Sequence, residues 1–183
     1  MEIEARIRER MPLETYQEAL LFLDSYALAL HPRLREHPKL EQMEGYLAYL
    51  GNPQKKIRIL HVAGTSGKGS TSTMLARILQ TTGVRVGLVI SPHLMDIRER
   101  IQVDGRLISP ERFLTILNRQ LPVLHWMQES GHGLLSYLGL LLAMSICFFE
   151  EEGVEYAVLE TGIGGRFDLT NAIHGKDKVA LLT

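Results

Sequence analysis

Cysteine is nearly missing from this sequence: Cys147 is the single one among 183 residues. One cysteine cannot form an internal disulfide, so nothing supports an oxidising compartment, and a thiol inside an apolar run is typical of a small buried side chain. An excess of charge of one sign is missing too. The net charge of −1 argues against a nucleic-acid-binding surface and against an acidic tail.

A long hydrophobic run is also missing. The most apolar segment, residues 134–149, is shorter than the roughly 20 residues that a bilayer requires, and the glutamates of "EEE" follow it at once. The N-terminal segment "MEIEARIRER" is charged and lacks the apolar core of a secretory signal. We therefore predict a cytoplasmic protein with no membrane partner, in which residues 134–149 form a buried core helix.

The chain divides into a helical lead-in and a core. Apolar periodicity predicts helices over residues 15–30 and 39–50, the second one stopped by Gly51, Asn52 and Pro53. These belong to a lead-in over residues 1–55. Residues 56–183 then alternate between short apolar runs and helical patterns, with helices expected around residues 74–79 with a stop at Gly83, over 110–125 and over 134–151.

The apolar runs predict the strands of one sheet. "KIRILHVAG", "VRVGLVIS", "VEYAVLETG" and "KVALLT" are apolar on both faces, which is typical of parallel strands covered by helices on both sides. Asp104-Gly105 favours a two-residue hairpin turn. The prediction is an α/β fold of the P-loop type, with a mostly parallel sheet, a short N-terminal helical lead-in and a β-hairpin excursion.

A glycine-rich loop follows the first predicted strand, in "HVAGTSGKGSTSTMLARIL". Glycines let backbone N–H groups face an anion, a helix N-terminus favours phosphate, and Lys68 supplies a positive charge. The standard P-loop pattern is imperfectly matched, because Val62 stands where it has glycine and Gly69 where it has a hydroxyl. A tight turn with a solvated lysine is the alternative. We favour phosphate binding, with Ser70 or Thr71 holding magnesium or a phosphate oxygen.

The loop resembles that of the folylpolyglutamate synthase/dihydrofolate synthase family, a branch of the Mur ligases. "RVGLVISPHLMDIRERIQVDGRLIS" is similar to the second signature of that family, and "VLETGIGGRFDLTNAI" to its third. The resemblance implies ATP-dependent amide bond formation. ATP phosphorylates a carboxylate of folate or dihydropteroate, and the amino group of L-glutamate then attacks the acyl phosphate. It also implies the cofactors ATP and Mg²⁺ and a monomer when full length.

The resemblance further implies a role for particular residues. Lys68 and Glu160 would be catalytic, and Ser91, Glu160 and Ser70 would hold the metal. The substrate would lie beside Arg166, Phe167 and Asp168. The triphosphate would be held by the loop residues Gly64, Thr65, Ser66, Gly67, Lys68, Gly69, Ser70 and Thr71.

The chain departs from the family pattern in two ways. Family members are more than twice as long, so we expect an N-terminal portion of the ATP-binding domain that lacks the C-terminal domain and is inactive alone. Leu138, Gly139 and Leu142 also replace a Phe-Glu pair and a threonine that lie close to the pteridine. Two alternatives stay open: a Mur-type ligase acting on another carboxylate, and a non-catalytic nucleotide-binding fragment.

Overall fold

The computed structural model describes residues 12–162, 165–166 and 168–183, except for residues 31–39. The α-helices are α2 (Tyr16–Leu30), α3 (Leu40–Tyr49), α4 (Lys68–Gln80), α5 (Pro110–Glu129) and α6 (Tyr137–Glu151). The strands are β1 (Arg58–Ala63), β2 (Val86–Val89), β3 (Ile101–Val103), β4 (Arg106–Leu107), β5 (Tyr156–Glu160) and β6 (Lys178–Leu182). Short 3₁₀ helices are η2 (Pro53–Lys56), η3 (Ile97–Arg100) and η4 (Leu169–Ala172).

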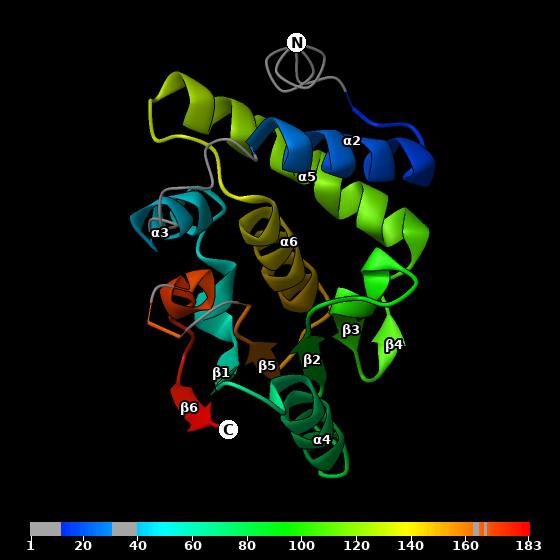
Figure 1. Cartoon of the computed structure of the whole chain (residues 1–183), viewed down its shortest axis with the longest axis vertical. Helices are drawn as coiled ribbons and strands as arrows, with labels where there is room; N and C mark the ends of the chain where they lie inside the picture. Colours follow the sequence, from blue (N-terminus) through cyan, green and yellow to red (C-terminus); the bar gives the residue numbers. More distant parts are fainter. Residues whose placement is uncertain (1–11, 31–39, 163–164, 167) are drawn as a thin grey trace.

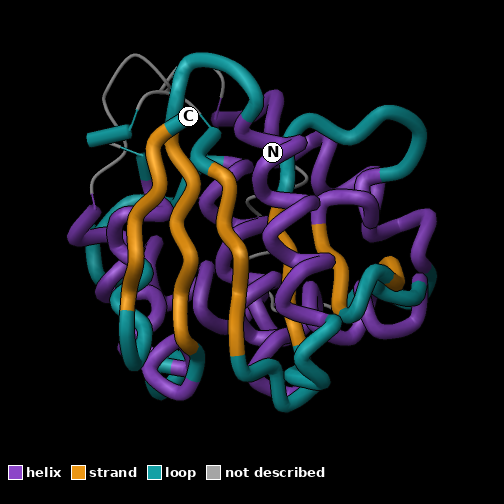
Figure 2. Tube along the Cα trace, turned by 90° about the horizontal axis from the view of Figure 1, so that it is seen from below, coloured by secondary structure: helices purple, strands orange, loops and turns teal. Residues whose placement is uncertain are grey.

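The described strands form one sheet in the order β4-β3-β2-β5-β1-β6. β2, β5, β1 and β6 are parallel neighbours, whereas β3 and β4 run antiparallel at one edge. Figure 2 shows the strands side by side with helices around them. The turn between β3 and β4 has positive φ at Asp104 (50°) and Gly105 (73°), which fits the predicted two-residue hairpin. The predicted α/β class and the hairpin excursion are confirmed.

Helices cover both faces of the sheet (Figure 1). α4 packs on one face, where Ala76 meets a small cluster made of Val62, Val86, Leu88 and Val158. α6 packs on the other face. It comes so close to β2 that a Cβ on Gly87 would lie 2.8 Å from the ring of Phe149. The glycine in β2 thus permits close contact between this helix and the sheet.

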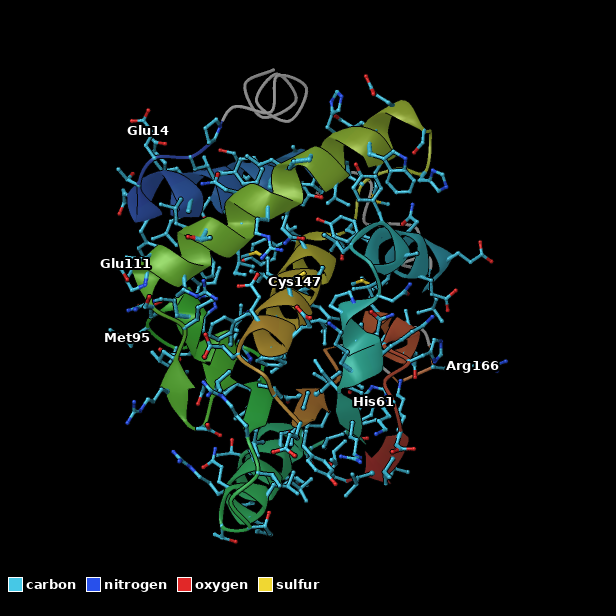
Figure 3. The ribbon with its side chains drawn as sticks, turned by 180° about the vertical axis from the view of Figure 1, so that it is seen from behind. Glu14, His61, Met95, Glu111, Cys147 and Arg166 are labelled. Carbon is cyan, nitrogen blue, oxygen red and sulfur yellow. The ribbon has the colours of Figure 1, made fainter. Side chains whose placement is uncertain are left out.

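α6 is the core of the molecule. Its apolar residues are buried nearly all round, because the sheet lies on one side and α2, α3 and α5 pack on the others. Cys147 lies on this helix in Figure 3. The prediction of a buried core helix for the most apolar segment is therefore confirmed. Among the described helices, none combines the length and the apolar character needed to cross a membrane.

α5 is longer than the sequence pattern suggested, since it continues to Glu129 instead of ending near His125. Pro122 lies within it with an exposed side chain. The flanking residues Leu121, Leu124 and Met127 are buried and keep the helical spacing across the proline. Packing against α2 and α6 therefore continues the helix where proline alone would favour its end.

Candidate active site

Three segments meet at the carboxyl ends of the parallel strands, as the sequence predicted. β1 leads into the glycine loop and α4, β2 leads to Ser91, and β5 ends at Glu160. Because β5 lies between β1 and β2 in the sheet, its last residue is flanked by the other two segments. This is the edge of a parallel α/β sheet at which ligands bind.

Glu160 joins the three segments through its side chain. Glu160 is only 6% exposed, and its carboxylate accepts a 2.8 Å hydrogen bond from the backbone N–H of Ser91. A methyl group added to Gly69 would lie 3.6 Å from each carboxylate oxygen. The carboxylate therefore lies between the first turn of α4 and the end of β2, where the sequence analysis expected a metal ligand.

Two glycines of the loop adopt backbone conformations that other residues rarely take. Gly64 and Gly67 both have positive φ, at 151° and 74°, and Gly67 caps α4 without a side-chain hydrogen bond. The first N–H groups of a helix have no partners within it, so they are available to an anion. A Cβ on Gly64 would overlap with Thr183, whose hydroxyl donates a 2.8 Å hydrogen bond to the carbonyl of Ser66.

Lys68 is half-buried at the start of α4, and its Nζ donates a 3.1 Å hydrogen bond to the carbonyl of Gly64. The ammonium group therefore lies over the loop. Thr65, Ser66 and Ser70 are exposed, and Thr71 is half-buried. The loop residues thus surround the helix start together, although their roles toward a nucleotide stay predictions.

Arg100 is a neighbour of this site that the sequence analysis did not single out. It is half-buried, and its Nε donates a 2.8 Å hydrogen bond to Nδ1 of His93. Burial lowers the pKa of Arg100, while Tyr137 and Glu160 act to raise it, which places all three groups in one electrostatic environment. Arg100 lies in "RERI", within the second signature. Its position in that motif was the signal available from the sequence.

The predicted substrate residues lie after β5, and the structure separates them. Asp168 accepts hydrogen bonds from the backbone N–H groups of Gly162 (2.8 Å) and Thr170 (2.9 Å). Arg166 is exposed and lies at the outer margin of the molecule in Figure 3. Phe167 lies outside the described residues. Asp168 thus holds its own loop together, and its predicted contact with substrate stays a prediction.

The helix that departs from the family pattern borders this loop. Leu138 is 42% exposed, and a Cβ on Gly162 would lie 3.7 Å from it. Gly139 is buried, and a Cβ there would lie 2.7 Å from a methyl group of Leu169. Leu142 is buried as well. Leu138 is thus the one of these three side chains that faces outward beside the loop.

The donors at this edge suit magnesium together with phosphate. In the part of the chain that the structure describes, no group of three or more His, Cys, Asp and Glu side chains could hold a metal ion. Magnesium in nucleotide sites takes one or two carboxylates and completes its shell with phosphates and water. The Glu160 carboxylate beside the loop fits that pattern, while metal binding by the hydroxyls of Ser91 and Ser70 stays a prediction.

Comparison with known proteins identifies the relatives of this chain. The dihydrofolate synthase/folylpolyglutamate synthase of Bacillus subtilis is 38% identical over 147 residues, which cover 79% of this chain and 34% of that protein. The mitochondrial folylpolyglutamate synthase of Homo sapiens is 38% identical over 176 residues, or 88% of this chain and 30% of that protein. Over most of its own length, the chain is a homologue of these synthases. No protein-family model matches it.

Solved structures agree with the sequence relatives. Folylpolyglutamate synthase from Thermotoga maritima superposes with a TM-score of 0.80 at 34% identity, over 91% of this chain and 38% of that one. A folylpolyglutamate synthase–AMPPCP–folate complex gives 0.79 at 31% identity, over 91% and 40%. A bifunctional folylpolyglutamate synthase/dihydrofolate synthase with Mn, AMPPNP and L-glutamate gives 0.74 at 28% identity, over 92% and 38%. The chain thus spans about a third of the length of its relatives.

Proposed function

We propose that this chain supplies the nucleotide-binding part of an ATP-dependent ligase that joins L-glutamate to the carboxylate of folate or dihydropteroate. The single observation that carries the proposal is the position of Glu160, which accepts a hydrogen bond from Ser91 and lies beside Gly69. Relatives in complex with nucleotide analogues, with folate and with L-glutamate support the same assignment.

The triphosphate of ATP would lie on the loop from Gly64 to Thr71. The N–H groups at the start of α4 supply a partial positive charge, and Lys68 adds a full one. The hydrogen bond from Lys68 to the carbonyl of Gly64 places the ammonium group over the loop. Phosphoryl transfer depends mainly on such positioning and charge neutralisation.

Magnesium would be held by Glu160, with Ser91 and Ser70 as oxygen donors. When bound, the ion neutralises charge on the phosphate oxygens. The chain contributes a preorganised carboxylate, because the hydrogen bond from Ser91 fixes it beside the loop. The 6% exposure of Glu160 further restricts its movement and the access of water.

The proposed reaction has two balanced steps. A carboxylate oxygen of the folate or dihydropteroate attacks the γ-phosphorus of ATP, the bond to ADP breaks, and an acyl phosphate forms. The amino nitrogen of L-glutamate then attacks the acyl carbon, phosphate leaves, and the nitrogen loses a proton as the amide forms. Segment 165–168, with Arg166, Phe167 and Asp168, would border the pterin or its carboxylate.

The proposed setting follows from the same features. The partners would be small molecules only, because a net charge of −1 provides no basic surface for nucleic acid. We further propose a cytoplasmic location, and a monomer for the full-length enzyme. The chain on its own would bind nucleotide weakly, since it covers about a third of its relatives.

A Mur-type ligase acting on another carboxylate is the second candidate. Leu138 presents an apolar, 42% exposed side chain beside Gly162, and Gly139 has no space for a larger one unless Leu169 moves. Neither leucine nor glycine can bond a pteridine through its side chain. A substrate without a pteridine ring would therefore fit beside Leu138 and Gly139 equally well.

Calorimetric titration of the 183-residue chain tests these proposals. We expect AMPPNP to bind more tightly with Mg²⁺ than without it, with a Kd weaker than about 1 μM. With ATP, Mg²⁺, folate and L-glutamate, the chain alone should synthesise no amide. Folate should then bind more tightly than p-aminobenzoylglutamate, which lacks the pteridine. Equal affinities would favour the second candidate, and binding without catalysis in the longer protein would favour a non-catalytic module. No nucleotide binding at millimolar concentration would reject all of them.

A further inference from the structure

A buried chain of polar side chains lies beneath the loop that follows β5. His61 on β1 is 4% exposed and Thr170 in η4 is 5% exposed. Nε2 of His61 lies 2.6 Å from Oγ1 of Thr170, which in turn lies 2.5 Å from Oδ1 of Asp168. Figure 3 labels His61 at β1. Asp168 and Thr170 lie two residues apart at the start of η4, whereas His61 is 109 positions from Thr170, so the fold brings the imidazole to this pair.

The direction of each hydrogen bond follows from the chemistry of the groups. A carboxylate is an acceptor, so the single hydrogen of the Thr170 hydroxyl goes to Asp168. The hydroxyl oxygen must then accept from His61, which requires a hydrogen on Nε2. His61 is thus assigned the Nε2–H tautomer by its partner. The two hydrogen bonds therefore run in one direction: the imidazole donates to the hydroxyl, and the hydroxyl donates to the carboxylate.

Asp168 also contacts the segment that follows β5. Its Oδ2 accepts a 2.8 Å hydrogen bond from the backbone N–H of Gly162, two residues after Glu160. Lys178 on β6 closes the other side, donating to the carbonyls of Thr170 (3.0 Å) and Asn171 (3.2 Å). The carboxylate therefore connects Gly162 with Thr170, and Lys178 connects η4 with β6.

His61 also belongs to the strand that carries the phosphate loop. It lies three residues before Gly64, and β1 continues without interruption to Ala63. A strand position is fixed by the pairing of β1 with β5 and β6 on its two sides. His61 therefore connects the strand before the phosphate loop with the loop after β5.

We propose that His61 is a positioning residue, which sets the Asp168 carboxylate through the Thr170 hydroxyl and so fixes the segment beside the phosphate loop. The consequence for substrate binding rests on the proposed function. The contact itself does not, so it can be tested separately. Burial, and next the charge of Lys178, lower the pKa of His61 to about 4, with Asp168 opposing the shift. A neutral imidazole at pH 7 agrees with the assigned tautomer.

The first test measures the contact without any ligand. In ¹⁵N-histidine spectra of the chain at pH 7, His61 should show a protonated Nε2 and an unprotonated Nδ1. Thr170→Val removes the hydroxyl at constant shape, and amide exchange at Gly162 should become at least about tenfold faster. Thr170→Ser should restore wild-type exchange. An Nδ1–H tautomer in the wild type, or unchanged exchange in Thr170→Val, would overturn the proposal, and the tautomer test holds even if that variant does not fold.

The second test separates positioning from nucleotide binding. Thr170→Val should weaken folate binding by at least about tenfold and change AMPPNP affinity by less than about twofold. Thr170→Ser should bind folate like the wild type. Thr115→Val is the matched control, since this exposed hydroxyl donates to Glu111 on α5. Equal folate affinity in Thr170→Val and wild type would overturn the link to substrate. If the wild type binds no folate, the proposed function fails, while the tautomer and exchange measurements still test the contacts of His61 and Thr170.

Discussion

The backbone N–H of Ser91 donates a 2.8 Å hydrogen bond to the side chain of Glu160. Ser91 follows β2, and Glu160 is the last residue of β5. The two strands are adjacent and parallel, with Val89 opposite Leu159. The bond therefore joins two loops at the same edge of the sheet. The same carboxylate is buried beside Gly69. Removing the charge while keeping an acceptor is consequently an informative change.

Glu160→Gln should leave the fold intact and remove the effect of Mg²⁺ on nucleotide binding. The amide oxygen of glutamine can still accept from Ser91, so the loop contact survives. The neutral amide is a poor ligand for a hard cation. Calorimetric titration with AMPPNP, with and without Mg²⁺, measures the change. Glu41→Gln, on the exposed surface of α3, is the control and should behave like the wild type. A magnesium effect that persists in Glu160→Gln would refute the metal assignment.

Lys68→Ala should weaken nucleotide binding by about 2 kcal/mol or more, roughly thirtyfold, because a charge-assisted contact with phosphate is lost. The melting temperature should change little, since Lys68 makes one described hydrogen bond, to the carbonyl of Gly64. Titration and circular dichroism check both expectations. Lys55→Ala, exposed in η2 before the opposite end of β1, is the matched control. Unchanged affinity in Lys68→Ala would mean that the loop is only a turn.

The strands and their common edge could be predicted because each depends on local signals. Buried apolar runs mark the parallel strands, and glycine with lysine marks the loop between β1 and α4. The carboxyl ends of parallel strands share one edge, so Ser91, Glu160 and the loop had to meet. Their meeting needed no knowledge of individual distances.

The polar contacts beneath that edge could not be predicted, because they join residues far apart in sequence. His61 and Thr170 are separated by 109 positions. Each looks ordinary alone, a histidine in a strand and a threonine in a turn. α5 shows the same limitation, since the sequence pattern predicted a helix over residues 110–125, while packing against other helices continues it to Glu129. In both cases tertiary contacts decide what local pattern leaves open.

Glu151→Gln should lower the free energy of unfolding by about 1 kcal/mol, through an ion pair that joins α6 to α5. Arg112 lies 2.6 Å from its carboxylate, Arg119 also contacts it, and the glutamate side chain is 19% exposed. Urea denaturation measures the loss. Glu150→Gln is the neighbouring control, since its partner Lys56 has a 73% exposed side chain and the pair should contribute little. Equal losses in the two variants would contradict the assignment.

Acidification from pH 7 to pH 5 should destabilise the chain through His61. The pKa of this imidazole is lowered from 6.5 to about 4, mainly by burial and then by Lys178. The unfolded chain therefore takes up a proton near pH 6.5, while the folded chain takes it up only near pH 4. More protons bind to the unfolded state throughout this window, so stability falls as pH falls. The stability is fully present above about pH 6.5.

Removing this group should flatten the dependence on pH. In urea denaturation at pH 7, 6 and 5, the slope of unfolding free energy should approach the uptake of one proton per molecule in the wild type. His61→Gln should reduce that slope while lowering stability at pH 7, because its contact with Thr170 is altered. His174→Gln, an exposed histidine beside Glu44, should keep the wild-type slope. If His61→Gln and wild type show the same slope, His61 is not a buried neutral imidazole.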